Sequence, residues 1–418
     1  MNRCRLFLQF QLNWGFVCVL LIGVFVILAQ VDVAKTAEPS PSQKDELVDK
    51  ELRQKLTDYL EDINRWIMNL DVGSGILKNQ KDKTEVTDSI FVNGNFARVL
   101  MASHRITGNK AYLNEALRWC DTFYKQQQLV ITSTIEEGGF WTDFYKPSGN
   151  IYFGDAGTAA TALAIGYRLA DSKRKALYLK AMERYARFVM RGSLTDPQGL
   201  GREAAKSWVI SQGQDRGALG CGYYRGHLSL KPYTIATATT GGAFFSELFA
   251  ITSKQQYKDV ALGATKWLLK IRAEDGEIPY ILDGVGPDGW DWPLDTITYC
   301  TEAFVAADVH LKDSAFQSFL RKELKSTVQW LLERQNPDGT WGKLRSPDQQ
   351  RSPGVVTLLA WYYRNAEPDP RIAESIRRYC YFLLDPENSR AYGVKELVRT
   401  TGFVGLAVAG LIKPESTF

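Results

Sequence analysis

The strongest constraint on the fold is an alternation of two kinds of helical segment along the chain. One kind is small and apolar, as in residues 155–170 (DAGTAATALAIGYRLA) and 400–412 (TTGFVGLAVAGLI). The other kind is amphipathic and highly charged, as in residues 172–191 and 313–335. A helix that is apolar on all sides is buried, whereas a helix with one apolar stripe lies at a surface. The alternation therefore predicts an inner ring of helices enclosed by an outer ring.

We expect twelve helices in six consecutive hairpins. The outer helices are expected at about residues 44–70, 109–127, 172–191, 254–272, 313–335 and 369–384, and the inner helices at about 89–106, 155–170, 240–252, 295–310, 352–365 and 400–412. Connections from an inner to an outer helix are short, whereas those from an outer to an inner helix are long. The predicted fold is all-α, an (α/α)6 toroid or barrel whose long loops share one face, the usual place for function.

The N-terminal segment differs from the rest of the chain. Arg3 and Arg5 precede an unbroken apolar run at residues 14–29. This run is longer than a signal-peptide core and shorter than a typical spanning helix of about 20 residues. Basic residues before such a run keep the amino end in the cytoplasm.

The chain is therefore expected to have three parts. Residues 1–30 form an N-terminal hydrophobic helix that serves as a signal anchor or a cleaved signal peptide. Residues 31–43 form a stalk or linker, and residues 44–418 form the barrel domain. The barrel would be exported to the secretory-pathway lumen or an extracytoplasmic space, attached to the membrane by the single N-terminal helix. A cleaved leader would instead give a secreted protein.

Composition excludes several classes of function. The net charge is only +4 and no run is rich in Lys and Arg, so no nucleic-acid partner is expected. The three histidines fit no metal-ligand spacing, and no glycine loop of the phosphate-binding type occurs. We therefore expect neither a metal nor a cofactor. The histidines are His104, His227 and His310.

Cysteine usage leaves the redox state open. Four cysteines of the barrel are widely scattered, and separate buried thiols are favoured over two disulfides because most of them fall on predicted helices. These cysteines are Cys120, Cys221, Cys300 and Cys380. The oligomeric state is not indicated by the sequence.

Each inner helix is expected to open with a capping residue, whose oxygen accepts a free backbone N–H at a helix start. The expected caps are Asp88, Asp155, Thr240, Asp295, Ser352 and Thr401. If the inner helices are parallel, their positive ends converge on the long-loop face, each with about half an elementary charge. That mouth would attract anions, which favours acidic sugars as ligands.

At this point the chain resembles the six-hairpin glycosidase superfamily over residues 44–418. Within it, the unsaturated glucuronyl and rhamnogalacturonyl hydrolases look most similar, on residues 107–112 (TGNKAY), 137–141 (EGGFW) and 151–155 (IYFGD). The resemblance implies an (α/α)6 barrel with two carboxylates in its mouth, one of them a general acid/base. Asp155 and Asp88 are the residues that match by position.

The chemistry of the residues supports a similar set. Glycoside hydrolysis usually needs two carboxylates about 5–10 Å apart. The long loops and inner-helix starts offer Asp88, Glu137, Asp143, Asp155, Asp291, Asp295 and Glu302. From these we expect Asp155, Asp88 and Asp295 to be catalytic, with N-capping as the alternative role of each.

Aromatic and basic residues of the long loops are candidates for substrate binding. Arginine can hold a carboxylate through two hydrogen bonds, and aromatic rings can stack on a sugar face. The expected substrate-binding residues are Tyr223, Tyr224, Arg225, His227, Trp290, Asp291, Trp292, Trp141 and Arg351. Aromatic residues that merely plug the barrel mouth are the alternative.

These features predict a carbohydrate-active enzyme, a glycoside hydrolase with paired carboxylates acting on glycans that can contain uronate. A uronate lyase or epimerase is the first alternative, with Tyr223 or Tyr224, His227 and Arg225 as its machinery. A non-catalytic glycan-binding or scaffold protein is the second. Residues 335–341 (QNPDGTW) also resemble the repeat of triterpene cyclases, but this single copy reads better as a turn.

Overall fold

The computed structural model describes residues 47–70, 89–129, 138–142, 150–191, 207–224, 227–281, 292–342 and 351–417. The chain divides into two compact units, Met1–Glu46 and Leu47–Phe418, and every described residue lies in the second. The expected leader and stalk lie outside the described residues. Within the described ranges, no helix is both long and apolar enough to cross a bilayer.

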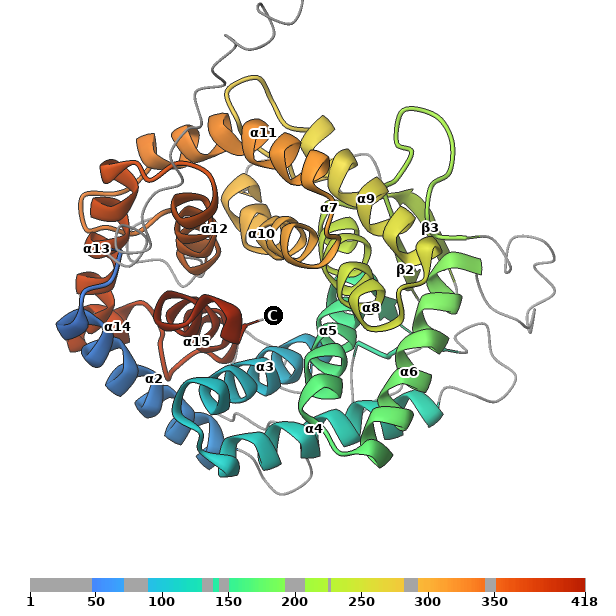
Figure 1. Ribbon diagram of the computed structural model, residues 1–418, viewed down its shortest axis with the longest axis horizontal. Helices are drawn as coiled ribbons and strands as arrows, with labels where there is room; N and C mark the ends of the chain where they lie inside the picture. The colour runs from blue at the N-terminus through green and yellow to red at the C-terminus, as the bar shows by residue number, and fades with distance from the viewer. Residues whose placement is uncertain are drawn as a thin grey trace, which may run out of the picture. The chain divides into compact units, whose positions relative to one another are not determined.

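Six helical segments of the described chain form a closed inner ring (Figure 1). They are α3 (Ile90–Thr107), α5 (Phe153–Leu169), the continuous segment α7 (Thr234–Ala236), η2 (Thr237–Phe244) and α8 (Phe245–Thr252), then α10 (Trp292–His310), α12 (Arg351–Asn365) and α15 (Val398–Ile412). Each packs against the next in this order, and α15 returns to pack against α3. The core of the unit lies between this ring and the helices outside it.

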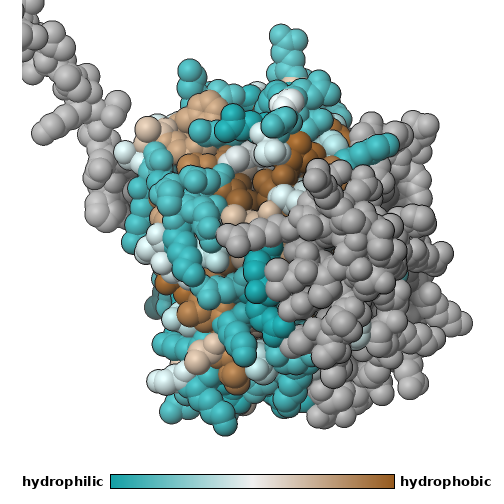
Figure 2. All heavy atoms as spheres, turned by 90° about the vertical axis from the view of Figure 1, so that its right-hand side faces the viewer, coloured by the Kyte–Doolittle hydropathy of each residue, from teal (hydrophilic) through white to brown (hydrophobic). Residues whose placement is uncertain are grey.

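Six amphipathic helices surround the inner ring. They are α2 (Lys50–Leu70), α4 (Lys110–Leu129), α6 (Ser172–Arg191), α9 (Gln255–Lys270), α11 (Ser314–Glu333) and α13 (Pro370–Leu384). Two short helices complete the described chain: α14 (Pro386–Ala391) follows α13, and η4 (Pro414–Ser416) follows α15 of the inner ring. On the side of the barrel shown in Figure 2, hydrophilic atoms cover most of the described surface and apolar patches lie between them. The predicted all-α barrel is confirmed for the described part of the chain.

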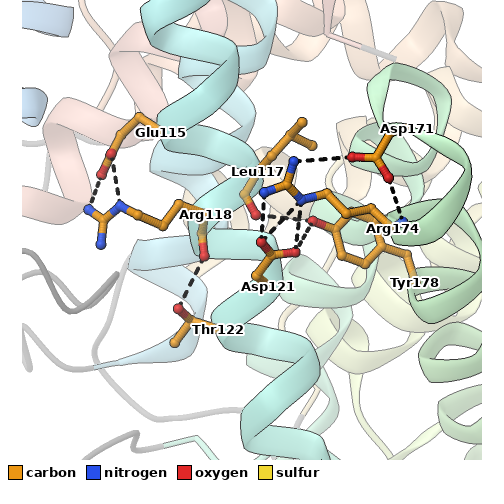
Figure 3. Close-up of polar contacts among 8 residues, drawn as sticks. All are labelled: Glu115, Leu117, Arg118, Asp121, Thr122, Asp171, Arg174 and Tyr178. Atoms are coloured by element: carbon orange, nitrogen blue, oxygen red, sulfur yellow. Dashed lines mark hydrogen bonds and ion pairs between the residues drawn. The ribbon is translucent and has the colours of Figure 1, made fainter.

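Polar side chains join neighbouring outer helices (Figure 3). The guanidinium of Arg174 on α6 donates to both carboxylate oxygens of Asp121 on α4, at 3.0–3.2 Å. The hydroxyl of Tyr178 lies 2.7 Å from the same carboxylate and 3.0 Å from the carbonyl of Leu117, so the two acceptors share its one proton. Because Tyr178 is buried, this cluster fixes the first two turns of α6 against α4.

A small sheet interrupts the helical architecture, which the sequence did not indicate. β1 (Ile151–Tyr152), β2 (Gly220–Tyr224) and β3 (His227–Pro232) form three antiparallel strands in the order β1-β2-β3. β2 and β3 are a hairpin inside the long connection between α6 and α7. The strands are too short for an alternating pattern to stand out from the surrounding loop.

Glycines bring the inner helices close together. A Cβ on Gly157 of α5 would lie 2.7 Å from the Thr240 backbone nitrogen of η2. A Cβ on Gly354 of α12 would lie 2.7 Å from the Thr298 Oγ1 of α10. Real side chains do not tolerate such distances, so these interfaces need residues without a Cβ. Comparable glycines occupy three further contacts of the ring, Gly94 against α5, Gly242 against α10 and Gly405 against α3.

The predicted N-caps are wrong wherever the structure describes them. Asp155 is the third residue of α5, Thr240 lies inside η2, and Thr401 is the fourth residue of α15. Ser352 and Asp295 likewise follow the first residue of their helices, and Asp88 lies outside the described residues. Their helices begin earlier because packing extends them upstream. Thr401 instead donates back to the Leu397 carbonyl at 2.7 Å, as a hydroxyl within a helix can.

Buried charges fasten the ring at the short-turn end, where the inner helices finish. Glu247 of α8 is fully buried between Arg168 of α5, which forms an ion pair with it, and His310 of α10. The His310 Nε2 lies 3.2 Å from the carboxylate. Burial alone would raise the pKa of Glu247, but the charges of His310 and Arg168 outweigh it and lower the pKa to about 2. The expected structural role of His310 is consistent with this contact.

The four barrel cysteines are free and buried, which confirms the favoured prediction of separate thiols. Burial raises the pKa of Cys120, Cys300 and Cys380 well above that of a free thiol. These thiols are therefore protonated and packed as small apolar side chains.

We expect Gly354→Ala to lower the free energy of unfolding by about 2 kcal/mol, because overpacking a tight contact usually destabilises by about 1–3 kcal/mol. Gly410 of α15 is the matched control, since a Cβ there would come no closer than 3.9 Å to another residue. Gly410→Ala should be neutral or stabilising by up to about 1 kcal/mol through helix propensity. Urea unfolding measures both, and equal stability of the two variants would contradict the packing argument.

We expect the stabilising effect of Glu247 to disappear in acid. A carboxyl with a folded pKa of about 2 and an ordinary unfolded pKa near 4.3 contributes its full stability above about pH 5 and loses it as the pH falls toward 2. The gap in unfolding free energy between the wild type and Glu247→Gln should be roughly 2–3 kcal/mol at pH 7 and should narrow between pH 5 and pH 3. Urea unfolding at these pH values measures the gap, and a gap independent of pH would refute the assignment.

Candidate functional site

The inner helices run parallel, so their amino ends share the long-loop face. Gly94 of α3 packs beside Thr158 of α5, and Gly157 of α5 packs beside Thr240 of η2. Farther along the ring, Gly402 of α15 packs beside Asn95 of α3. In each pair, residues at similar depths in their helices meet, which requires parallel axes. The positive ends of the helix dipoles therefore point to one face, as the sequence predicted.

Asp155 is the one expected catalytic residue whose side chain the structure describes. It lies in the first turn of α5 at the long-loop face and is half-buried. The amino end of a helix stabilises a carboxylate at this place by about 0.3–1 kcal/mol. Its position therefore places a carboxylate at the long-loop face, next to the positive end of α5.

The charge of Asp155 acts on two tyrosines, the half-buried Tyr233 and the fully buried Tyr185. Burial raises the pKa of Tyr233 well above its usual value, and contacts with Tyr280 and the charge of Asp155 raise it further. The Tyr280 hydroxyl lies 3.5 Å from that of Tyr233. Burial also raises the pKa of Tyr185, with a smaller contribution from Asp155. These phenols therefore stay protonated at neutral pH and act as hydrogen-bonding groups rather than bases.

The small sheet places the predicted tyrosine-rich segment beside Asp155. Tyr223 of β2 pairs with Ile151, and Gly222 pairs with Tyr152, just before α5 begins. Tyr224 and His227 form the last pair of the β2–β3 hairpin. The backbone thus brings this hairpin to the start of α5, although the side chains of Tyr223, Tyr224 and His227 are not described.

The segment around Trp141 joins the same region. The carbonyl of half-buried Trp141 accepts a hydrogen bond from Gln126 at 3.2 Å. Thr142 is hydrogen bonded to Asn150 at 3.0 Å and to Ile90, the first residue of α3, at 2.9 Å. Trp141 therefore stands between the beginnings of α3 and α5, near the expected mouth.

The other expected site residues are placed only in part. Asp295 and Trp292 lie in the first turn of α10, and Arg351 is the first residue of α12, so all three stand at the long-loop face. The side chains of these three are not described. Asp88, Arg225, Trp290 and Asp291 lie outside the described residues, and so do Glu137 and Asp143.

An ion pair crosses the barrel axis below the mouth. Arg98 of α3 and Glu302 of α10 come from opposite helices of the ring, and Arg98 Nη1 lies 2.8 Å from Glu302 Oε1. Their side chains are 2% and 13% exposed. Tyr299 and Phe403 meet beside them edge to face, with ring centroids 5.7 Å apart. These four side chains, hereafter the floor, meet about halfway along the inner helices.

Sequence reasoning missed Arg98 and gave Glu302 no specific role. The available signal was one charge within each of two apolar stretches, Arg98 within residues 90–103 and Glu302 within residues 296–307. A charge on a buried helix must have a partner, so Arg98 and Glu302 could have been sought as a pair.

A small cavity of about 30 Å³ adjoins the floor. Arg98, Glu302, Thr298 and Thr357 line it, and Thr417 closes it from the short-turn end. This volume holds one or two water molecules, and it is far smaller than the ligand pockets of about 300–1,000 Å³ that enclose whole molecules. Within the described ranges, no group of three or more His, Cys, Asp or Glu residues is arranged to hold a metal.

Comparison with known proteins places this geometry in a fold. No family model and no curated protein matches the sequence. Among solved structures, cellobiose 2-epimerase from Spirochaeta thermophila matches with a TM-score of 0.61 and 13% identity, over 87% of this chain and 97% of that chain. A polysaccharide lyase matches with a TM-score of 0.57 and 13% identity, over 88% and 99%.

A third match is an inactive variant of an α-1,6-mannanase from Salegentibacter in complex with α-1,6-mannotriose, with a TM-score of 0.53 and 12% identity, over 85% and 99% of the two chains. All three are members of the six-hairpin glycosidase superfamily. The chain has the six-hairpin glycosidase fold. At these identities the likeness shows the fold alone, and the expected closer likeness to the unsaturated uronyl hydrolases stays a prediction.

We expect Gly222→Ala to detach the β2–β3 hairpin from β1. Gly222 has φ +125°, and a Cβ would collide with the Ile151 carbonyl. Gly213→Ala is the control, because Gly213 also has positive φ (+74°) but a Cβ there would meet nothing within 4 Å. Hydrogen–deuterium exchange at residues 219–224 should rise in Gly222→Ala only. Equal exchange in both variants would mean that the pairing with β1 does not hold the hairpin.

Proposed function

We propose that the barrel is a glycoside hydrolase that acts on uronate-containing glycans, with Asp155 as one of its two catalytic carboxylates. The observation that carries this proposal is the position of Asp155, half-buried in the first turn of α5 among the converging amino ends of the inner helices. Those helix ends favour an anionic substrate, and the carboxylate supplies the acid–base or nucleophilic chemistry.

The solved structures that share the fold support a carbohydrate substrate. They include an epimerase of cellobiose, a polysaccharide lyase and a mannanase in complex with a mannotriose. Carbohydrate chemistry thus recurs on this fold, although the reactions differ. A glycan partner is therefore the part of the proposal that the fold supports best.

The second carboxylate must come from a separate element. The inactive mannanase variant carries two consecutive Asp→Asn substitutions, whereas this chain contains no two consecutive aspartates. We propose Asp88, two positions before Ile90 in the sequence, or Asp295, in the first turn of α10, as the partner of Asp155. Two carboxylates on different inner helices can face each other across a sugar ring.

One observation favours a uronate lyase or epimerase as the second candidate. The β2–β3 hairpin, which carries Tyr223, Tyr224 and His227, is hydrogen bonded to the strand that leads into α5. Such residues can remove the C5 proton of a uronate while Arg225 holds its carboxylate. A glycan-binding protein without activity would use the same mouth without turnover.

We also propose that the barrel is exported and attached to the membrane through residues 1–30, or secreted if they are cleaved. The basic residues Arg3 and Arg5 before the apolar run at 14–29 support this topology. Protease accessibility of the barrel in intact cells tests it, because an exported barrel is digested without lysis.

We expect Asp155→Asn to lower kcat by about 10²–10⁴-fold on unsaturated uronyl oligosaccharides, because it removes an acid–base group. Loss of the absorbance of the enol-ether double bond measures turnover. Asp171→Asn is the control, since Asp171 is an exposed aspartate that accepts from a backbone N–H at the start of outer helix α6. It should retain full activity.

The same assay separates the alternatives. Gain of this absorbance from intact polymers would indicate a lyase, and inversion at C5 without cleavage would indicate an epimerase. An Asp155→Asn enzyme with wild-type kcat would refute the assignment of Asp155.

A further inference from the structure

We propose that Glu302 contacts the sugar residue bound deepest in the mouth, accepting a hydrogen bond from one of its hydroxyls, and that Arg98 positions this carboxylate. The inference rests on the proposed function, because it assumes that a glycan enters the mouth. It adds a binding residue below Asp155 and predicts that the substrate directs a hydroxyl, and not a carboxylate, toward it.

The location of the pair puts it in the path of such a ligand. Arg98 and Glu302 meet from opposite helices of the ring, so they occupy the axis of the lumen rather than a helix interface. Close packing of Gly157 against η2 and of Gly242 against α10 relates the depths of α5 and α10. By this register Glu302 lies about one helical turn below Asp155, or roughly 5 Å along the axis.

Stability alone does not account for the pair. Burying an arginine and a glutamate among apolar helices carries a large desolvation penalty that their attraction barely offsets. Apolar residues of similar size usually serve stability equally well or better. The neighbouring floor residues Tyr299 and Phe403 show that this level of the lumen can accommodate apolar packing.

The two members of the pair differ in what they offer a ligand. The Arg98 side chain is 2% exposed, and its Nη1 also contacts Asn95 Oδ1 at 3.4 Å. Its Nε is buried and makes no hydrogen bond, so the site holds an unused donor. Glu302 is the more accessible member, at 13% exposed, and Arg98 contacts its Oε1. A carboxylate held in this way accepts hydrogen bonds and donates none.

The cavity beside the floor sets the size of the group that can enter. Its volume of about 30 Å³ suits one or two waters, so a sugar ring must remain above the floor and reach it with a hydroxyl. That hydroxyl would replace a water without losing hydrogen bonds. A carboxylate would be repelled by Glu302, so a uronate must point its charge toward the helix ends at the mouth instead.

A double substitution tests this inference without leaving a buried charge unpaired. In Arg98→Met/Glu302→Met, two flexible apolar side chains replace the pair, and the melting temperature should stay within a few degrees of the wild type. Dissociation constants for glucose, mannose and glucuronic acid are measured by ligand-observed NMR titration of the full chain. We expect the variant to bind at least tenfold more weakly whichever of these sugars the wild type binds, because a hydrogen bond to a charged group is lost.

Arg168→Met/Glu247→Met/His310→Met is the matched control, because it removes another buried charged cluster of the inner ring, at the short-turn end, together with both partners of Glu247. It should bind sugars as the wild type does. If the floor variant does not fold, Arg98→Gln/Glu302→Gln keeps the polar contact without charge and should also weaken binding.

The outcomes separate this inference from the proposed function. A folded floor variant with unchanged sugar affinity overturns the inference and leaves the hydrolase proposal intact. Weakened binding together with unchanged kcat in Asp155→Asn supports the inference and removes the catalytic assignment. A wild type that binds none of the three sugars overturns the inference.

Discussion

The close approach of the inner helices is the contact on which the rest of the structure depends. At the interfaces of α5 with η2 and of α12 with α10, Gly157 and Gly354 leave no room for a Cβ. A ring packed this tightly has a lumen narrow enough for one ion pair to cross, as Arg98 and Glu302 do. Larger residues at these contacts would widen the ring and separate that pair. Packing between helices therefore determines the chemistry available on the axis.

Parallel packing creates an electrostatic conflict that the sequence resolves at the short-turn end. Six parallel helices gather unpaired carbonyls and partial negative charge where they finish. Arginine side chains pair with these carbonyls. Arg364 donates to the carbonyls of Gly410 and Leu411 at 3.1 and 3.0 Å, and Arg53 donates to the carbonyl of Ile412 at 3.0 Å. Arg168 and His310 stand in the last turns of α5 and α10 and share Glu247. Side chains of the protein thus offset the partial negative charge at the short-turn end.

Periodicity was sufficient to predict the helices and most of their starts to within three residues, the two exceptions being α2 and the segment that begins with α7. The bounds of α6 at Ser172–Arg191 match the expectation, because an amphipathic stripe ends where its charges do. The segment expected to begin at Thr240 begins instead at Thr234, since α7 and η2 are buried on all sides and carry no stripe to mark a boundary. Residues that commonly cap helices also gave the wrong helix starts in these buried segments. A buried threonine can bond a carbonyl within the helix and so need not mark its end.

The candidate site likewise has a part that the sequence could predict and a part that only the fold reveals. Asp155 could be found because it stands at the edge of an apolar segment, where a carboxylate is conspicuous. The sequence could show that Arg98 and Glu302 each need a partner, but their pairing with each other depends on ring closure, because they lie 204 positions apart. The hairpin beside Asp155 was expected as a loop, and only its register against Ile151 shows which backbone it adjoins.

The mouth and the floor of the barrel therefore have different electrostatic roles. At the mouth, the converging helix ends contribute positive potential, and Asp155 offsets only part of it. At the floor, Arg98 and Glu302 cancel in net charge, so they contribute direction rather than attraction. An acidic sugar would therefore be drawn by the mouth and oriented by the floor, with its carboxylate outward and a hydroxyl inward. In that orientation the glycosidic bond of the deepest sugar lies at the level of Asp155, between the mouth and the floor.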